Sequence, residues 1–325
     1  MKKILSIFTV SFALVFSSSA FANTIGVVYD SGGKFDKSFN ELAFNTAERV
    51  VNELGWGMIE FESANDNQIE QGMRKIADRG ATMIVGMGFA QADAIGAVAA
   101  DYPDIKFVAV DVCWLDDPNN NIYQACYKEH EGSFLVGMMA AMASKSGTIG
   151  FVGGMDIPLI RKFQGGYEQG AQYVNPDITV LANMTGTTNE AWNNPTKGAE
   201  LTKAQIDGGA DVVYQAAGGT GIGVLQAAAD AGIMGIGVDS NQNWMHPGTM
   251  LTSMLKRLDL TIFEQAQNVA KGSFESGINI LGLSEGMLGY ATEDGMVTSE
   301  MAAAADAAAA DIASGALVVA DWSQE

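Results

Sequence analysis

Four aspartates stand where an apolar, strand-length run gives way to glycine or polar residues. Asp30 follows IGVVY, Asp111 follows FVAV, Asp156 follows IGFVGGM, and Asp239 follows IGV. A single aspartate at such a place is most often a helix cap or a turn former. Two in each half of the chain predict a shared polar crevice, because ligands of open α/β sheets bind beyond the carboxyl ends of the strands.

Several aromatic residues lie next to strand ends, among polar residues and glycines rather than inside apolar periodic runs. They are Phe35, Phe39, Phe89 and Trp192. An isolated aromatic side chain is usually part of a core, but at a crevice it can stack on a flat ligand. Asp36 and Asn40, which neighbour two of these rings, can exchange hydrogen bonds with hydroxyls and ring nitrogens.

Residues suited to catalysis are scarce. His130 and His246 are the two histidines, and neither belongs to an H-E-x-x-H pattern or a similar set of metal ligands. The chain has no G-x-S-x-G nucleophile elbow. We therefore expect a binding protein rather than an enzyme, with no cofactor and no metal.

Two glycine-rich stretches resemble phosphate loops only in part. SGGKF lacks both the leading glycine of the P-loop and the Ser or Thr that follows its lysine, and in GGTGIG Val224 stands where the dinucleotide pattern has its last glycine. Gly218 and Gly219 still precede a predicted helix, whose free N–H groups can meet a ligand. A plain tight turn is the alternative.

Cys113 and Cys126 are the two cysteines, and they flank the turn-rich loop WLDDPNNNIYQA. In an oxidising compartment such a pair can close a disulfide, and two buried free thiols are the alternative. Either role is structural, because a closed zinc site needs four ligands.

The first 22 residues are typical of a secretory signal. Lys2 and Lys3 precede a short apolar run and an Ala-Phe-Ala cleavage site. No cysteine follows the cut, so we expect a free periplasmic protein without a lipid anchor. Removing two lysines leaves 16 basic against 38 acidic residues, a net charge near −22. Such a charge repels nucleic acid and anionic lipid surfaces.

Strand-length and helix-length segments alternate along the chain, and the second half repeats the first. Strands are expected at 25–29, 57–62, 83–86 and 106–111, and helices at 39–54, 67–79 and 91–100. The interval from GATMIV to VAVD matches that from GADVV to IGVD, and IGVVYD matches IGFVGGMD. This pattern predicts an α/β protein made of two similar doubly wound domains.

An ordered set of motifs then identifies a family. DSGGKFDKSFN, EHEGSFLVG, GFVGGMD, AAGGTGIGV and GVDSNQ together resemble the basic membrane protein family of ABC-transporter substrate-binding proteins, which includes purine nucleoside receptors. The resemblance implies the type I periplasmic binding protein fold, with two Rossmann-like lobes and three crossovers between them. It implies lobes of residues 23–128 plus 253–280 and of residues 129–252 plus 281–325.

The resemblance also implies a role for each site residue. Asp30 and Asp36 would face a purine base, with Phe39 and Trp192 stacked on its two sides. Asp111 would lie near the base.

Asp239 and Lys256 would hold the ribose hydroxyls, with Lys256 offsetting the charge of Asp239, and Gly218 and Gly219 would let the backbone approach the sugar. A monomer that captures a purine nucleoside for an ABC permease is therefore expected. A free nucleobase, a sugar or another small polar metabolite is the alternative ligand.

Overall fold

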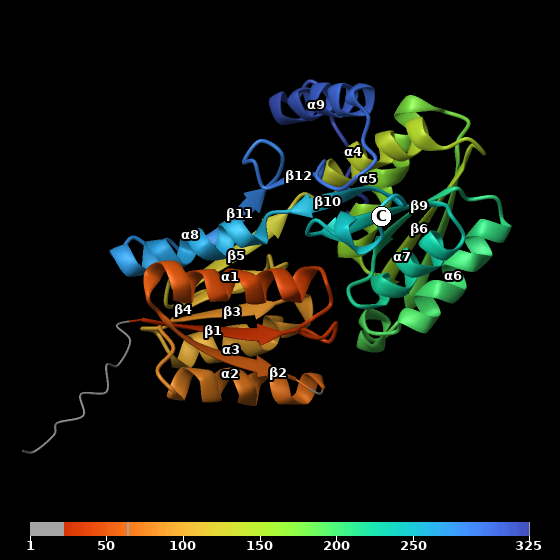
Figure 1. The fold of residues 1–325 in the computed structure, drawn as a ribbon. Coiled ribbons are helices and arrows are strands. Elements are labelled where there is room, and N and C mark those ends of the chain that lie inside the picture. Colours follow the sequence, from red (N-terminus) through yellow and green to blue (C-terminus); the bar gives the residue numbers. More distant parts are fainter. Residues whose placement is uncertain (1–22, 64, 325) are drawn as a thin grey trace, which may run out of the picture.

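The computed structural model describes residues 23–63 and 65–324, so the predicted signal peptide lies outside the described residues. The chain forms two lobes, each built on a six-stranded sheet (Figure 1). The strand orders are β11-β5-β4-β3-β1-β2 in the first lobe and β12-β10-β9-β8-β6-β7 in the second.

The first lobe is a parallel sheet with helices on both faces. Its strands are β1 (Thr24–Tyr29), β2 (Gly57–Glu62), β3 (Met83–Met87), β4 (Lys106–Val110), β5 (Ile122–Tyr127) and β11 (Gly277–Leu281). Its helices are α1 (Phe39–Leu54), α2 (Ile69–Asp78), α3 (Ala92–Asp101) and α8 (Leu258–Lys271). In Figure 1, α1 and α8 lie side by side on one face, and α2 and α3 cover the other. The inner strands are buried on both faces, which explains their continuous apolar sequence.

The second lobe has the same plan. Its strands are β6 (Thr148–Met155), β7 (Thr179–Gly186), β8 (Val212–Ala216), β9 (Met234–Asp239), β10 (Met250–Lys256) and β12 (Leu288–Tyr290). Its helices are α4 (Glu129–Ala143), α5 (Pro158–Val174), α6 (Pro195–Asp207), α7 (Thr220–Asp230) and α9 (Ser299–Ser314). The last strand differs between the lobes, because β12 pairs antiparallel with β10 while β11 pairs parallel with β5. The predicted fold class and internal repeat are confirmed.

The chain passes between the sheets three times. It crosses from β5 into α4, from β10 into α8, and from β11 to β12. Strand β10 stays paired within the second sheet through Lys256. The passage back to the first lobe therefore follows Lys256, whereas the resemblance implied a passage at residue 253.

Cys113 and Cys126 are joined by a disulfide between the end of β4 and β5. No helix in residues 23–63 and 65–324 has the length and apolar character needed to cross a membrane. The same residues hold no group of three or more His, Cys, Asp or Glu side chains placed to bind a metal ion.

Candidate functional site

A cavity lies between the two lobes, at the carboxyl ends of the central strands of both sheets. Its empty volume, counted together with the open mouth, is about 550 Å³. The predicted site residues that line it are Asp30, Asp36, Phe39, Phe89, Asp111, Trp192, Gly218, Asp239 and Lys256. Residues from both halves of the chain therefore meet in one place.

Two acids of the first lobe, Asp30 and Asp36, are held by backbone amides and by Asn40. Asp36 lies ahead of α1 and accepts hydrogen bonds from the N–H groups of Ser38, Asn40 and Glu41, so it caps the helix. The Asn40 amide donates to Asp30 Oδ1, and its oxygen accepts from the Asp30 N–H. Asn40 is fully buried and contacts both acids, Asp30 through its side chain and Asp36 through its backbone N–H.

Burial raises the pKa of both acids. Desolvation raises the pKa of Asp36 to about 7, although three amides hydrogen-bond to its carboxylate. The pKa of Asp30 is raised for the same reason. At neutral pH the Asp36 carboxyl can therefore both accept and donate hydrogen bonds, which suits the mixed donor and acceptor edge of a heterocycle.

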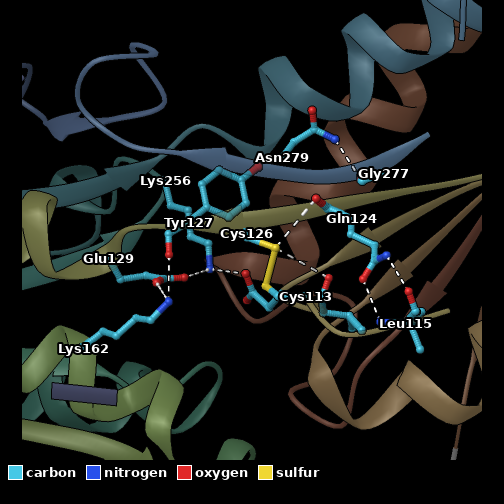
Figure 2. Close-up of a disulfide and its surroundings, with 12 residues drawn as sticks. Cys113, Leu115, Gln124, Cys126, Tyr127, Glu129, Lys162, Lys256, Gly277 and Asn279 are labelled. Carbon is cyan, nitrogen blue, oxygen red and sulfur yellow. Dashed lines mark hydrogen bonds and ion pairs between the residues drawn. A yellow bond between two sulfur atoms is a disulfide. The ribbon is translucent and has the colours of Figure 1, made fainter. Parts of the chain in front are cut away.

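A buried ion cluster forms another part of the site, and Figure 2 shows its residues Lys256, Glu129 and Lys162. Lys256 Nζ lies 2.6 Å from Asp111 Oδ1 and 3.0 Å from Glu129 Oε1. Lys162 Nζ lies 3.4 Å from Glu129 Oε2. Burial lowers the pKa of Lys256, but attraction to Asp111 and Glu129 outweighs it, so the pKa is raised and the side chain stays an ammonium. The direct partners of Lys256 are these two acids, rather than the Asp239 suggested by the resemblance.

Asp239 lines the cavity, and its two carboxylate oxygens differ in their contacts. Its Oδ2 accepts a hydrogen bond from Ser38 Oγ of the first lobe at 3.1 Å. Its Oδ1 is buried and has no hydrogen-bond partner. Because an unpaired buried acceptor is costly, this oxygen is a ready acceptor for a ligand hydroxyl.

Aromatic rings supply the flat walls. Phe89 and Trp192 come from different lobes and meet edge to face, with ring centroids 6.5 Å apart. Trp192 closes a short turn, η3 (Asn189–Trp192), and lies against Gly154 of β6. A Cβ at Gly154 would fall 2.1 Å from the indole, so only glycine leaves room for this ring. Phe39 Cε1 reaches toward Gly88, and its ring lies 5.4 Å from Lys256 Nζ.

Several residues singled out from the sequence lie outside the cavity lining. The Phe35 ring is 58% exposed and packs against Phe44. Asp156 is exposed and forms a two-pronged ion pair with Arg161. Gly219 faces the first lobe instead of the cavity.

Two contributors could not be recognised in the sequence. Phe163 of α5 lines the cavity, yet it falls in a helical apolar period with Ile160 and Tyr167 that is typical of a core position. Glu129 is fully buried beside the cavity, and its only sequence signal is an acid at the start of an apolar helix. Both depend on how α4 and α5 enter the cleft.

The lobes touch across the cleft. The Lys37 carbonyl accepts hydrogen bonds from Ser240 Oγ and Gln242 Nε2 at 3.1 and 3.0 Å. A Cβ at Gly219 would lie 2.8 Å from the Gly32 carbonyl oxygen of the other lobe. The closed arrangement therefore requires a bare backbone at Gly219.

Replacing Gly219 with alanine is expected to weaken ligand binding about tenfold with little change in the melting temperature of the ligand-free protein, because overpacking costs ~1–3 kcal/mol only while the lobes are closed. The backbone of Gly219, at φ −60° and ψ −26°, suits alanine. Titration calorimetry and thermal melts would measure both quantities. Gly96→Ala is the control, since its Cβ would make one ordinary contact at 3.6 Å. Equal affinities for the two variants would contradict the expectation.

The ligand-free protein is expected to melt at a higher temperature as the pH falls from 7.5 to 5. Burial raises the pKa of Asp36 to about 7 and that of Asp239 to about 6, from 3.8 in the unfolded chain. A carboxyl whose pKa is raised on folding holds its proton more tightly in the folded protein than in the unfolded chain. Its contribution to the free energy of unfolding is complete below the unfolded pKa and is lost as the pH rises through 6 to 7. Calorimetric melts at each pH test this, and Asp239→Asn should flatten part of the slope. A melting temperature that falls steadily over this range would contradict it.

The architecture and the site define a class. Two doubly wound lobes joined by three crossovers, with a closed polar and aromatic cavity between them, form a binding protein of the periplasmic type. A crystal structure of an ABC transporter system solute-binding protein from Aeropyrum pernix K1 is similar over 92% of this chain and 94% of that one, with a TM-score of 0.83 and 26% identity.

The family follows from sequence similarity. Residues 23–321 match the family model for PnrA-like ABC transporter substrate-binding proteins, and the chain belongs to this family. It is 30% identical to the "ABC transporter nucleoside-binding protein BmpA" of Lactococcus lactis, over 90% of this chain and 88% of that protein. It is 31% identical to "Basic membrane protein A2" of Borrelia garinii, over 82% of this chain and 79% of that protein. Members of the family are not enzymes; they bind a small molecule outside the cytoplasm and deliver it to a permease.

Proposed function

We propose that this protein is a periplasmic receptor that captures a purine nucleoside in its interlobe cavity and delivers it to an ABC permease. It is exported by cleavage after Ala22, carries no lipid anchor and acts as a monomer. The observation that carries the ligand assignment is the set of groups that share the cavity. It combines two buried acids with raised pKa values, Asp30 and Asp36, with aromatic rings and with Asp239, one of whose carboxylate oxygens has no hydrogen-bond partner.

Each part suits one part of a nucleoside. Phe39 and Trp192 supply stacking for the base, which is worth ~1–3 kcal/mol for a base on an aromatic ring. Asp30 and Asp36 can pair with the donors and acceptors of the base edge. Asp239 accepts from ribose hydroxyls, since a charged acceptor strengthens such bonds.

Lys256 and Gly218 also line the cavity. Lys256 keeps Asp111 from facing a neutral ligand as an uncompensated buried charge. Gly218, with φ 55°, lets the backbone turn close to the sugar. The name of the Lactococcus lactis relative supports a nucleoside as the ligand.

Titration calorimetry of the purified protein, stripped of carried-over ligand by mild unfolding, tests this proposal. Guanosine, inosine and adenosine should bind, uridine should bind more weakly, and guanine and ribose should each bind more weakly than guanosine. Binding of a free base or a sugar in place of every nucleoside would assign the site to that ligand. Heat from none of these compounds would overturn the purine assignment.

A further inference from the structure

The disulfide lies beside the ion cluster of the cavity, not in a remote loop (Figure 2). Its two Cα atoms are 5.7 Å apart. Cys113 comes two residues after Asp111, and Cys126 comes three residues before Glu129. Asp111 and Glu129 are the two acids that hold Lys256, so the cross-link joins the two segments that carry them.

The cross-link begins where the pairing of β4 with β5 ends. The last registered pair is Val110 with Ala125, and the Asp111 N–H donates to the Ala125 carbonyl at 3.0 Å. Cys126 comes directly after Ala125, and Cys113 comes three residues after Val110. The disulfide therefore keeps the two segments together beyond the last β4–β5 pair, next to Asp111 of the cavity lining.

Asp111 has a backbone conformation that its surroundings must maintain. Its φ is 62°, a left-handed value that is unfavourable for a residue with a side chain. Asp239 occupies the matching place in the second lobe, with φ 65°. There the buried Gln242 side chain accepts hydrogen bonds from the Val238 N–H and from Gln215 Nε2. In the first lobe the Cys113–Cys126 disulfide begins two residues after Asp111.

The other cysteine is next to Tyr127, which contacts both lysines of the cluster. The Tyr127 carbonyl accepts a hydrogen bond from Lys162 Nζ at 3.1 Å. The Tyr127 ring lies 4.8 Å from Lys256 Nζ, and its hydroxyl is bonded to Thr261. Displacing Tyr127 would move the surroundings of both ammonium groups.

We propose that the Cys113–Cys126 disulfide is a positioning element of the ligand site. It holds Asp111 and Tyr127 in the geometry in which Lys256 neutralises the acids of the cavity, so its loss weakens ligand binding as well as stability. The choice of guanosine as the probe rests on the proposed function, whereas the positioning role does not.

The first test compares Cys113→Ser/Cys126→Ser with Val98→Ala by guanosine calorimetry at a temperature where both variants are folded. Val98 is a fully buried residue of α3 in the same lobe and does not line the cavity. Both variants should melt below the wild type. The dissociation constant should rise about tenfold, which corresponds to about 1.4 kcal/mol, in the cysteine variant alone.

A pH profile separates positioning from plain stabilisation. Asp111, once less well paired with Lys256, titrates at a higher pH, because attraction to the ammonium lowers its pKa against the effect of burial. The other charged groups around the cluster are unchanged in the cysteine variant and in Val98→Ala. They are Glu129, Asp239 and Lys162. The acid limb of the affinity profile should therefore move to higher pH in the cysteine variant and stay in place in Val98→Ala.

Reduction of the folded wild-type protein supplies a measurement that needs no mutation and no ligand. Cys113 is half-buried, and a small phosphine serves as the reductant. Amide hydrogen exchange at residues 111–113 and 126–129 should accelerate about tenfold on reduction, while exchange in α3 stays unchanged.

Unchanged exchange at these residues would overturn the positioning role, and so would equal guanosine affinity in the cysteine variant and the wild type. If the wild type binds no nucleoside, the proposed function fails, and the exchange measurement still decides this inference.

Discussion

Replacing Lys256 with methionine is expected to lower the free energy of unfolding by about 3–5 kcal/mol, the usual effect of removing one partner from a buried ion pair. Lys256 is 1% exposed, and its ammonium is the direct partner of Asp111 and Glu129. Methionine fills a similar volume, so the loss reports the uncompensated acids and not a cavity. Urea denaturation of the ligand-free protein measures it.

Two further variants make this result specific. Lys162→Met removes the other lysine that contacts Glu129, at 3.4 Å, but Glu129 keeps its closer partner Lys256 at 3.0 Å, so we expect a much smaller loss than for Lys256→Met. Combining Lys256→Met with Asp111→Asn and Glu129→Gln should recover much of the stability, because the buried charges are removed together. A triple variant as unstable as the single one would show that Lys256 acts through packing.

The second large effect is expected at Asp239. Asp239→Asn should weaken guanosine binding about a hundredfold, since hydrogen bonds to a charged acceptor are worth ~1.5–3 kcal/mol. The wild type should prefer guanosine to 2′-deoxyguanosine and 3′-deoxyguanosine. The variant should lose most of this preference, because the free oxygen of Asp239 is the proposed acceptor for the ribose hydroxyls.

Asp156→Asn is the matched control for that experiment. Asp156 also ends a strand in the second lobe, but it lies on the surface and pairs with Arg161. Its replacement should leave both the affinity and the preference unchanged. Equal weakening of guanosine and both deoxynucleosides by Asp239→Asn would assign Asp239 to closure of the lobes, through its bond to Ser38.

The fold could be predicted because its signals are local. Apolar runs of strand length alternate with helical periods, and the same order occurs in both halves, so the doubly wound lobes follow from periodicity and repetition. The helix at 39–54 and the strand at 57–62 have the predicted bounds. The position of the crossing near residue 253 was harder to predict, because β10 continues to Lys256 without any change in composition.

The sequence by itself determined which side chains stand at the carboxyl ends of the strands, because that place depends only on where each apolar run stops. The tertiary structure decided which of them share a cavity. Asp30, Asp111 and Asp239 line it, while Asp156 turns to Arg161 on the surface. It also decided that Lys256 pairs with Asp111 and Glu129, and that Phe163 forms part of the wall. These outcomes depend on how two lobes, joined by three crossings, place residues more than a hundred positions apart within hydrogen-bonding distance.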